Sequence, residues 1–474
     1  MAKEKTNLNR KLLAPFKGDL AIWFIFIALA IISLISVYSS IGYSAIISGT
    51  TPIHAFLKHL LFVVATLIGV IFIANFNYRR FASLSWFGYI LSVALLVGVL
   101  LIGHKENTPG SGMNRWIDLP LIGHFQPSEL AKIVIIVYLA RLIALEKTTL
   151  HEWKTFRRIG VSVLIVIALI LPDNLSTAVI IGFVCLAMLR LSPINVTHWR
   201  RTVLALIVIG VLAIMLGSKM NFGPLARSST WASRIDNWVN FNDDELTQES
   251  MARMAVASGK FFGVGIGSTV QARLMTQAHN DLIYAIIIEE SGMLGGIIVF
   301  LLYAYLYLRC IRIAWQCKGT FGRMTVVGLG TLIFLQAAIH MGVSVGALPI
   351  TGQNLPFISS GGTAYLCMGL ALGIIQAVAH DVNRSKALAE SSSTQQQEDD
   401  IKEERERMDS LNDKDNESID EPTPEKTVED EEKPSDNKKK ETAAEGNKKV
   451  PIEETDWQSA AFGPSPDEIE KEEE

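Results

Sequence analysis

Residues 20–38 read LAIWFIFIALAIISLISVY, a run without a single charged side chain. A helix needs about 20 mainly apolar residues to cross the hydrocarbon layer of a bilayer, so this run predicts a membrane-spanning helix. The chain is 49% hydrophobic, and its apolar residues come in long blocks of this kind. We find ten blocks, centred near Ile27, Val64, Val93, Ile136, Ile165, Phe183, Ile207, Val299, Ile333 and Gly369.

These blocks predict an all-α integral membrane protein with about ten transmembrane helices. The two short blocks on either side of Pro172-Asp173-Asn174 could instead form one re-entrant pair. The expected organisation is a short N-terminus at 1–18 and a membrane domain at 19–384. A long polar loop at 218–281 separates the seventh and eighth helices, and a tail follows at 385–474.

Basic residues gather in alternate connections, which predicts the orientation of the chain. They occur before the first block and after the second, fourth, sixth, eighth and tenth, while the short intervening connections hold almost none. Because lysine and arginine favour cytoplasmic loops, both termini are expected in the cytoplasm.

The tail differs in composition from the rest of the chain. From Ser391 onward it holds 29 acidic and 12 basic residues and few apolar ones, which predicts a disordered acidic cytoplasmic segment. A solvated tail is the simple interpretation, and docking of a partner through Trp457 and Phe462 is the alternative. The four cysteines fall in blocks or on the cytoplasmic side, so disulfides and a thiolate metal site are not expected.

Asp281 is the candidate catalytic residue. It lies where the long loop runs into the eighth block, in the sequence Gln277-Ala278-His279-Asn280-Asp281-Leu282. A carboxylate at a membrane mouth is poorly solvated, so its presence there indicates a use.

Glu129 and Lys132 lie three residues apart in Gln126-Pro127-Ser128-Glu129-Leu130-Ala131-Lys132, at the start of the fourth block. On a helix they would share one face. They could form a structural ion pair that fixes helix packing, or Lys132 and Arg115 could hold an anionic head group. Arg115, beside Trp116, could also be a simple interfacial anchor.

The stretch Ser359-Ser360-Gly361-Gly362-Thr363 precedes the last block. Its amides at a helix start could bind a phosphate, although a tight turn explains the glycines equally well. The glycine series at 259, 263, 265 and 267 matches no nucleotide-binding fingerprint and is expected to be a flexible turn-rich loop. Glu289 and Glu290 are expected to pair with inward-facing cations or with polar backbone.

Five motifs in this order resemble the SEDS family of shape, elongation, division and sporulation proteins, over about residues 19–380. They are Gly112…Arg115-Trp116-Ile117, Gln126-Pro127-Ser128-Glu129…Lys132, His279-Asn280-Asp281, Glu289-Glu290-Ser291-Gly292, and Leu355-Pro356-Phe357-Ile358-Ser359-Ser360-Gly361-Gly362. The family's Gln-Pro-Asp-x-Gly stretch is Leu171-Pro172-Asp173-Asn174-Leu175 here, which weakens any role for Asp173.

The resemblance implies ten transmembrane helices and a peptidoglycan glycosyltransferase that polymerises lipid II at the outer face of the cytoplasmic membrane. It implies that Asp281 is the essential aspartate and that Arg115, Glu129 and Lys132 are the family's arginine and its Glu-x-x-Lys pair. With Ser359, Gly361 and Gly362 from the candidate phosphate-binding stretch, these three are the predicted substrate-binding residues. Asp281 would act as the general base toward a sugar hydroxyl. Cations would stabilise the departing undecaprenyl pyrophosphate, with Mg²⁺ or Mn²⁺ as a further candidate although the sequence shows no dedicated metal site.

Tyr38-Ser39-Ser40 and Thr351-Gly352 favour the septal, cell-division branch of the family over the RodA-type elongation branch. The expected partners are a class B penicillin-binding transpeptidase and other divisome proteins, and no nucleic acid. A lipid II flippase is the rival function, since intramembrane charges suit transport, and a non-catalytic scaffold is a third. A flippase would need polar groups through the bilayer midplane, whereas here they collect at the outer mouth.

Overall fold

The computed structural model describes residues 16–47, 51–102, 104–105, 114–119, 123–172, 174–217, 238–239, 248–269, 271 and 278–417. Each of the predicted apolar blocks lies on a helix in these ranges. The helices are α2 (Leu20–Ile47), α3 (Pro52–Ala74), α4 (Arg79–Ile102), α5 (Pro127–Leu145), α6 (Trp153–Ile170), α7 (Leu175–Arg190), α8 (Val196–Gly217), α12 (Ile283–Gln316), α13 (Thr320–Ser344) and α14 (Gly362–Glu417).

Six of the described helices are long and apolar enough to cross a membrane, namely α2, α3, α4, α12, α13 and the first part of α14. The blocks on either side of Pro172 form two separate helices, and α7 has only 16 residues. α5 carries Glu129, Lys132 and Arg141 within its 19 residues. A count of ten crossings therefore stays a prediction.

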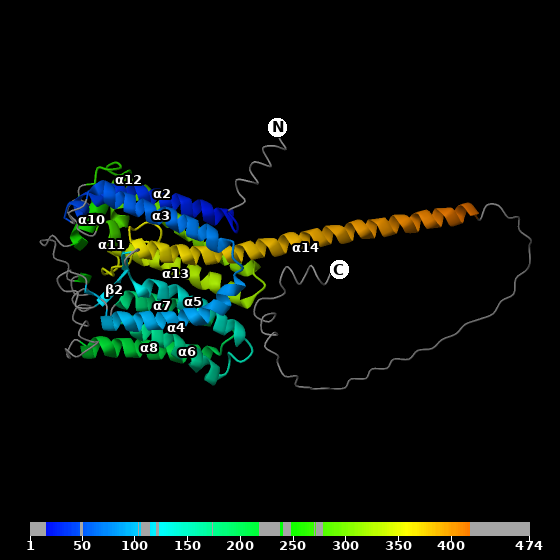
Figure 1. Ribbon diagram of the computed structural model, residues 1–474, viewed down its shortest axis with the longest axis horizontal. Helices are drawn as coiled ribbons and strands as arrows, with labels where there is room; N and C mark the ends of the chain where they lie inside the picture. Colours follow the sequence, from blue (N-terminus) through cyan, green and yellow to red (C-terminus); the bar gives the residue numbers. More distant parts are fainter. Residues whose placement is uncertain are drawn as a thin grey trace, which may run out of the picture. The chain divides into compact units, whose positions relative to one another are not determined.

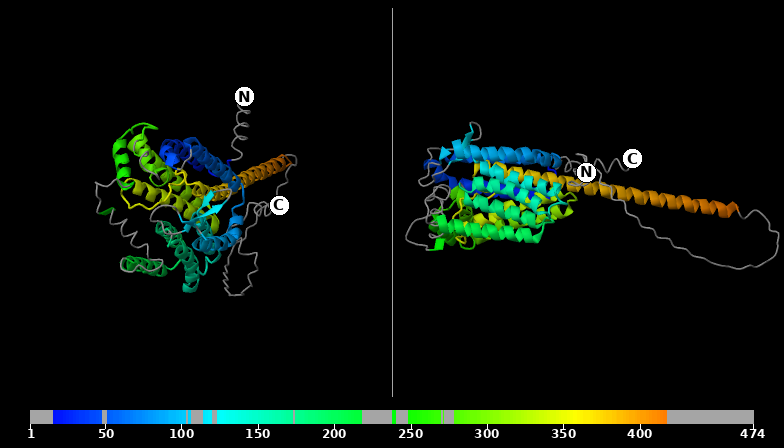
Figure 2. Two further views of the ribbon diagram at one scale, coloured as in Figure 1. Left: turned by 60° about the vertical axis from the view of Figure 1, so that its left-hand side comes forward. Right: turned by 90° about the horizontal axis from the view of Figure 1, so that it is seen from below.

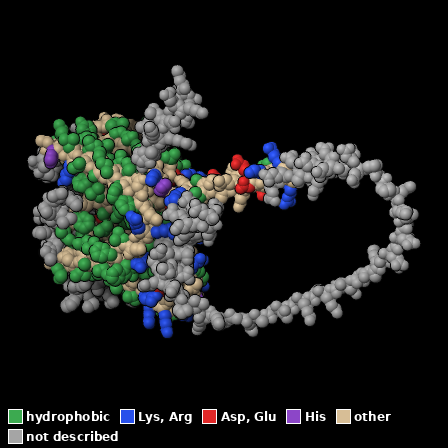
Figure 3. All heavy atoms as spheres, turned by 45° about the vertical axis from the view of Figure 1, so that its right-hand side comes forward, with side chains coloured by type: hydrophobic (Ala, Val, Ile, Leu, Met, Phe, Trp, Pro, Cys, Tyr) green, Lys and Arg blue, Asp and Glu red, His purple; other side chains and the backbone are tan. Residues whose placement is uncertain are grey.

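The helices of the bundle run side by side with similar axial directions (Figure 1; Figure 2). α13 packs against α5, α7 and α12, and α2 packs against both α3 and α12. α13 and the start of α14 are the most buried of the six candidate spans, whereas only 22% of the α3 and α4 spans is buried. Hydrophobic side chains cover much of the flank of the bundle (Figure 3). The surface pattern is thus that of a protein solvated by lipid around a packed centre.

A small antiparallel sheet lies in the connection between α4 and α5, at the same end of the bundle as the short helices α10 (Gln248–Gly259) and α11 (Ala278–Asp281) (Figure 1). Its strands are β1 (His104–Lys105), β2 (Asn114–Leu119) and β3 (Gly123–Phe125), in the order β1-β2-β3. Ile117 of β2 is opposite Phe125 of β3. The all-helical prediction holds for the bundle but missed this sheet, which is too short to show a clear alternating pattern.

Asp19 ties three helices together at the other end of the bundle. Its side chain accepts hydrogen bonds from the first amides of α2, at Ala21 (2.9 Å) and Ile22 (3.2 Å). The same carboxylate forms an ion pair with Arg309 of α12. The main chain of Asp19 exchanges two hydrogen bonds with the side-chain amide of Gln376 on α14. On α12 this cluster lies at Arg309, seven residues before the helix ends at Gln316.

α14 continues to Glu417 and so differs from the expectation of disorder beginning at residue 385. The segment is rich in Glu, Gln, Lys, Arg and Ala, which have good helix propensity. A helix that already exists can lengthen without a new nucleation step. A second unit of the chain begins at Arg384, and the structure describes it as far as residue 417, where it is helical. The rest of the predicted tail lies outside the described residues.

Candidate active site

Asp281 is the last residue of α11, separated from α12 by Leu282 alone, and it is partly buried. Its carboxylate lies beside the connection between α13 and α14, because a Cβ added to Gly352 would be 3.9 Å from Oδ2 of Asp281. Gly352 has a φ of 63°, a left-handed conformation that glycine adopts at little cost. The predicted catalytic residue therefore faces the loop that precedes the Ser359–Gly362 motif.

Asn280, the neighbour of Asp281, is held by both serines of that motif. Ser359 Oγ donates to the main-chain oxygen of Asn280 (2.7 Å), and Ser360 Oγ donates to its Oδ1 (2.8 Å). Ser359 Oγ also accepts a hydrogen bond from the amide of Leu355 (2.8 Å). Ser359 is thus a structural bridge in this arrangement, and it fixes the backbone that carries Asp281.

The Glu129–Lys132 pair is buried in the bundle and connects to the same loop. Lys132 Nζ lies 2.9 Å from Glu129 Oε1 and donates to Gln336 Oε1, also at 2.9 Å. Gln336 Nε2 in turn donates to the main-chain oxygen of Asn354 (2.9 Å). Lys132 is 0% exposed, so the structural ion pair is the interpretation that this geometry supports. A direct grip on substrate by Glu129 or Lys132 stays a prediction.

A second set of hydrogen bonds joins the loop to the start of α7. Gln353 Nε2 donates to Asn174 Oδ1 (3.2 Å) and to Thr177 Oγ1 (2.9 Å). Asn174 also caps α7 by accepting from the Thr177 amide (3.1 Å). The main-chain oxygen of Gln353 lies 2.7 Å from Nδ1 of the buried His340. The loop is therefore fixed from two sides of the bundle.

Gly361 and Gly362 are closely packed at the start of α14. A Cβ on Gly361 would lie 2.4 Å from Asn354 Nδ2, and one on Gly362 would lie 3.4 Å from the ring of Phe62. Close packing therefore accounts for Gly361, whereas a Cβ at Gly362 would make only an ordinary van der Waals contact. Phosphate binding by these amides stays a prediction.

Arg115 belongs to β2, but its side chain lies outside the described part of the structure, as does Asp173. The sheet itself is attached beside the site, because Thr363 Oγ1 donates to the main-chain oxygen of His124 on β3 (3.2 Å). β3 leads directly into α5. The strand that carries Arg115 is thus one strand away from the start of α14.

The partners described for Glu289 and Glu290 include polar backbone and hydroxyl groups, and pairing with polar backbone is one of the two expected arrangements. Glu290 Oε1 accepts from the Gly267 amide (3.0 Å) and from Ser39 of α2. Glu289 accepts from the Thr269 hydroxyl (2.5 Å). The glycine series belongs to a loop packed on α12, where helical geometry is interrupted at Gly292 (φ 73°).

Sequence reasoning missed Gln336, His340 and Gln353 as parts of the site. Gln336 and His340 stand inside an apolar block, where a buried amide and a buried imidazole are unusual enough to have been a signal. Gln353 gave no comparable signal, because it lies in a connection.

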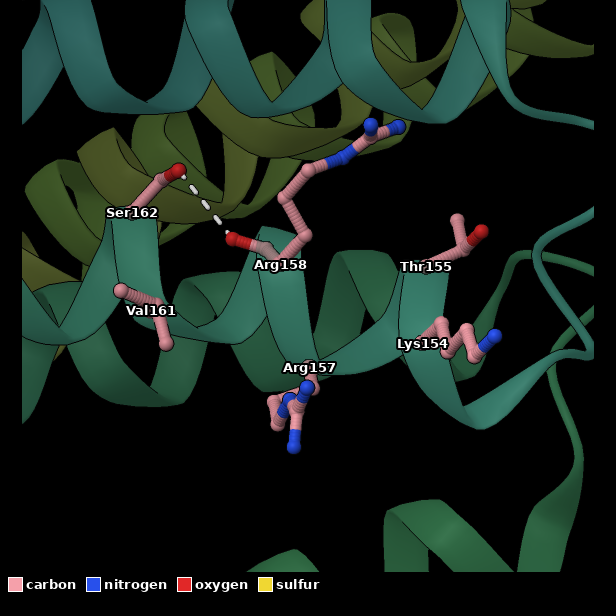
Figure 4. Close-up of a pocket in the computed structure, with 6 residues that line it drawn as sticks. All are labelled: Lys154, Thr155, Arg157, Arg158, Val161 and Ser162. Atoms are coloured by element: carbon pink, nitrogen blue, oxygen red, sulfur yellow. Dashed lines mark hydrogen bonds between the residues drawn. The ribbon is translucent and has the colours of Figure 1, made fainter.

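A basic pocket of about 520 Å³ lies on α6, at the end of the bundle opposite α11 (Figure 1; Figure 4). Lys154, Thr155, Arg157, Arg158, Val161 and Ser162 line it. None of the predicted site residues is among them. The polar cluster around Asp281 therefore remains the candidate site.

Comparison with known proteins gives matches over the bundle. A sequence model of the "Cell cycle protein" family FtsW/RodA/SpoVE matches residues 19–384. The chain is 33% identical to "Probable peptidoglycan glycosyltransferase FtsW" of Hydrogenovibrio crunogenus, over 64% of this chain and 76% of that protein. It is 29% identical to "Stage V sporulation protein E" of Bacillus subtilis, over 75% and 95% of the two chains.

Two solved structures share the fold. One is described as "Structural coordination of polymerization and crosslinking by a peptidoglycan synthase complex"; its TM-score is 0.61 at 22% identity, covering 77% of this chain and 98% of the other. The other is RodA of Thermus thermophilus, with a TM-score of 0.55 at 21% identity, covering 77% of this chain and 97% of RodA.

Proposed function

The chain belongs to the cell cycle protein family of FtsW, RodA and SpoVE, and from this premise we propose that it is a peptidoglycan glycosyltransferase. Its substrate would be lipid II, polymerised into β-1,4 glycan strands with release of undecaprenyl pyrophosphate. The proposal is supported by the curated relatives, which are named as glycosyltransferases of this kind. The observation that carries it is the placement of Asp281 beside Gly352, next to Asn280, whose main-chain oxygen is held by Ser359 and whose side chain is held by Ser360.

Asp281 is proposed as the general base. It would take the proton from the 4-hydroxyl of the acceptor sugar as that oxygen attacks the anomeric carbon of the donor. The bond from that carbon to the pyrophosphate breaks in the same displacement, so an α-linked donor gives a β-linked product. One carboxylate is sufficient, because inversion requires no glycosyl-enzyme intermediate.

Positive charge is needed where the pyrophosphate departs. Arg115 is the better candidate for direct contact, because Lys132 is buried and already engaged by Glu129 and Gln336. Lys132 would then act through the loop that it supports.

Mg²⁺ or Mn²⁺ is the other possible source of positive charge. Among the described residues, no three His, Cys, Asp or Glu side chains are grouped to hold a metal ion. A divalent cation held at the described residues would therefore depend on substrate phosphates for most of its ligands. The proposed steps rely on the chain's own groups.

We assign the septal, cell-division branch to this enzyme, because several of its curated relatives carry the FtsW name. The elongation branch is the alternative, and RodA of Thermus thermophilus shares the fold. A class B penicillin-binding transpeptidase, at the division septum with other divisome proteins, is the proposed partner. Both termini would lie in the cytoplasm.

The test is glycan synthesis by the purified full-length protein with its cognate transpeptidase and lipid II. Wild type should form polymer, and Asp281→Asn should form none while keeping its fold, because an amide cannot accept the proton. Glu146→Gln is the matched control, since Glu146 is a carboxylate paired with Arg158 at the other end of the bundle.

Equal polymer from wild type and Asp281→Asn would show that Asp281 is not the base. If neither protein makes polymer but proteoliposomes still translocate lipid II, the polymerase assignment is wrong and the flippase function is favoured.

A further inference from the structure

The loop at 260–267, with the sequence KFFGVGIG, exposes a continuous set of large apolar side chains. Phe262 is 78% and Ile266 70% exposed, and Phe261 and Val264 are also exposed. Lys260 is the one charged residue of this segment. Apolar surface of this kind is unfavourable in water, at roughly 25 cal/mol per Å². A cluster of such residues at a loop apex therefore marks a surface that is normally covered.

Backbone amide and carbonyl groups of this loop form hydrogen bonds with α12 at the point where that helix is interrupted. The positive φ of Gly292 frees carbonyl groups of α12, and the loop amides occupy them: Val264 donates to Glu289 O (2.9 Å) and Gly265 donates to Glu290 O (3.1 Å). In return, the carbonyl oxygens of Lys260 and Phe261 accept from the amides of Met293 (2.9 Å) and Leu294 (3.3 Å).

Further hydrogen bonds are made by Gly263, Gly267 and Ser268, whose amides donate to Gly259 O, Glu290 Oε1 and Gly265 O. Non-helical backbone can lie at membrane depth only when its polar groups are paired within the protein. The loop therefore turns paired polar groups toward α12 and apolar side chains outward.

The loop falls within the hydrocarbon layer when the Asp19–Arg309 ion pair is taken as the opposite boundary of that layer. Its contacts on α12 extend to Met293 and Leu294, and Arg309, which pairs with Asp19, lies seven residues before α12 ends at Gln316. From Met293 to Arg309 the helix rises by about 24 Å at 1.5 Å per residue. This is less than the roughly 30 Å thickness of the hydrocarbon layer.

The exposed face of α12 continues directly from the loop. Met293, Leu294, Ile297 and Ile298 are all exposed, and they belong to a helix long and apolar enough to span a membrane. We propose that residues 260–267 form a loop inserted into one leaflet of the bilayer, where Phe261, Phe262, Val264 and Ile266 contact lipid acyl chains. The inserted loop would hold α10 at a fixed depth in the membrane. Through its hydrogen bonds to α12 it would also fix the depth of Asp281, which precedes that helix. This assignment does not depend on the proposed enzymatic activity.

The test is the depth of a fluorophore at position 262. The four native cysteines are buried, and burial raises the pKa of the Cys317 thiol to about 11, so a cysteine introduced at an exposed site can be labelled selectively. Phe262→Cys, carrying the environment-sensitive fluorophore NBD, is placed in phosphatidylcholine–phosphatidylglycerol nanodiscs. Quenching is then compared between lipids with a nitroxide on the acyl chain and aqueous iodide.

Two positions serve as controls. Ile297→Cys represents the lipid-facing side of α12, and His151→Cys represents an exposed polar connection. We expect position 262 to behave like position 297, with strong quenching by the acyl-chain nitroxide and weak quenching by iodide. Ile266→Cys should give the same result, and it provides a second label position in the loop if Phe262→Cys does not fold.

Iodide quenching like that of position 151, at both 262 and 266, would place the loop in water and overturn the proposal. Protection from both quenchers would mean that protein covers the loop, for example a second copy of the chain, and would also overturn the assignment to lipid.

Discussion

At the scale of single residues, the buried Lys132 has a clear energetic role. Removing its charge in Lys132→Met leaves Glu129 as a buried carboxylate without a cation, and Glu129 Oε2 already lacks a hydrogen-bond partner among the described residues. Breaking a buried pair on one side costs about 3–5 kcal/mol, so a large loss of thermal stability is expected. Fluorescence-detected size-exclusion chromatography after heating measures this loss of thermal stability.

Lys154→Met is the matched control, because Lys154 is exposed on α6 and its loss should change stability little. The opposite outcome is also informative. If Lys132→Met keeps wild-type stability but no longer binds lipid II, then Lys132 contacts substrate and the structural interpretation is wrong.

Ser360 gives a second test at this scale. Ser360→Ala removes the hydroxyl that donates to Asn280 Oδ1, and a hydrogen bond of this kind contributes about 1 kcal/mol. If that energy orients Asp281 in the transition state, kcat should fall roughly fivefold while KM for lipid II changes little.

Ser162→Ala is the control for Ser360→Ala. It removes a serine hydroxyl that donates to Arg158 O at the far end of the bundle. A rise in KM with unchanged kcat for Ser360→Ala would instead indicate that the hydroxyl serves substrate binding.

At the scale of elements, the break in α12 depends on Gly292. A Cβ at this position would lie 2.2 Å from Phe261 O and 2.5 Å from Gly263 N, and the residue has a φ of 73°. Its ψ of −176° completes a backbone conformation that is essentially restricted to glycine, and holding an L-residue there costs about 1–3 kcal/mol. Gly292→Ala should therefore lower the thermal midpoint and reduce activity, because the loop and α12 must separate.

Gly98→Ala is the matched control, since Gly98 lies in α4 with no atom near its would-be Cβ. Alanine there should be neutral or slightly stabilising, by up to about 1 kcal/mol. Equal thermal midpoints for the two variants would contradict the proposed role of the break.

The same element shows how far the sequence predicts this fold. The apolar run around Val299 predicts a helix because hydrophobicity over about 20 residues is a local property. The interruption at Gly292 was not predicted, because it exists only when loop 260–267 supplies partners for the freed carbonyl groups. Likewise Asp281 stands out as a charge at a membrane mouth. Its neighbour Asn280 is hydrogen-bonded to Ser360, 80 residues further along the chain. That contact was not predicted, because it depends on how the helices pack.

At the scale of the whole molecule, the family match ends at residue 384, and the second compact unit begins there. The bundle contains every described group of the candidate site. We therefore expect a chain that ends at Arg384 to polymerise lipid II at the wild-type rate with the same transpeptidase. Gel separation of labelled glycan strands measures the product.

A chain that ends at Ile375 provides the contrasting control. It lacks Gln376, whose amide bonds both the amide and the carbonyl of Asp19 at the start of α2. It also loses the buried turn of α14 that includes Ala377 and Val378. This truncation should abolish both stability and activity. If ending the chain at Arg384 already removes activity while the protein remains folded, the acidic segment takes part in polymerisation or in its activation by the partner.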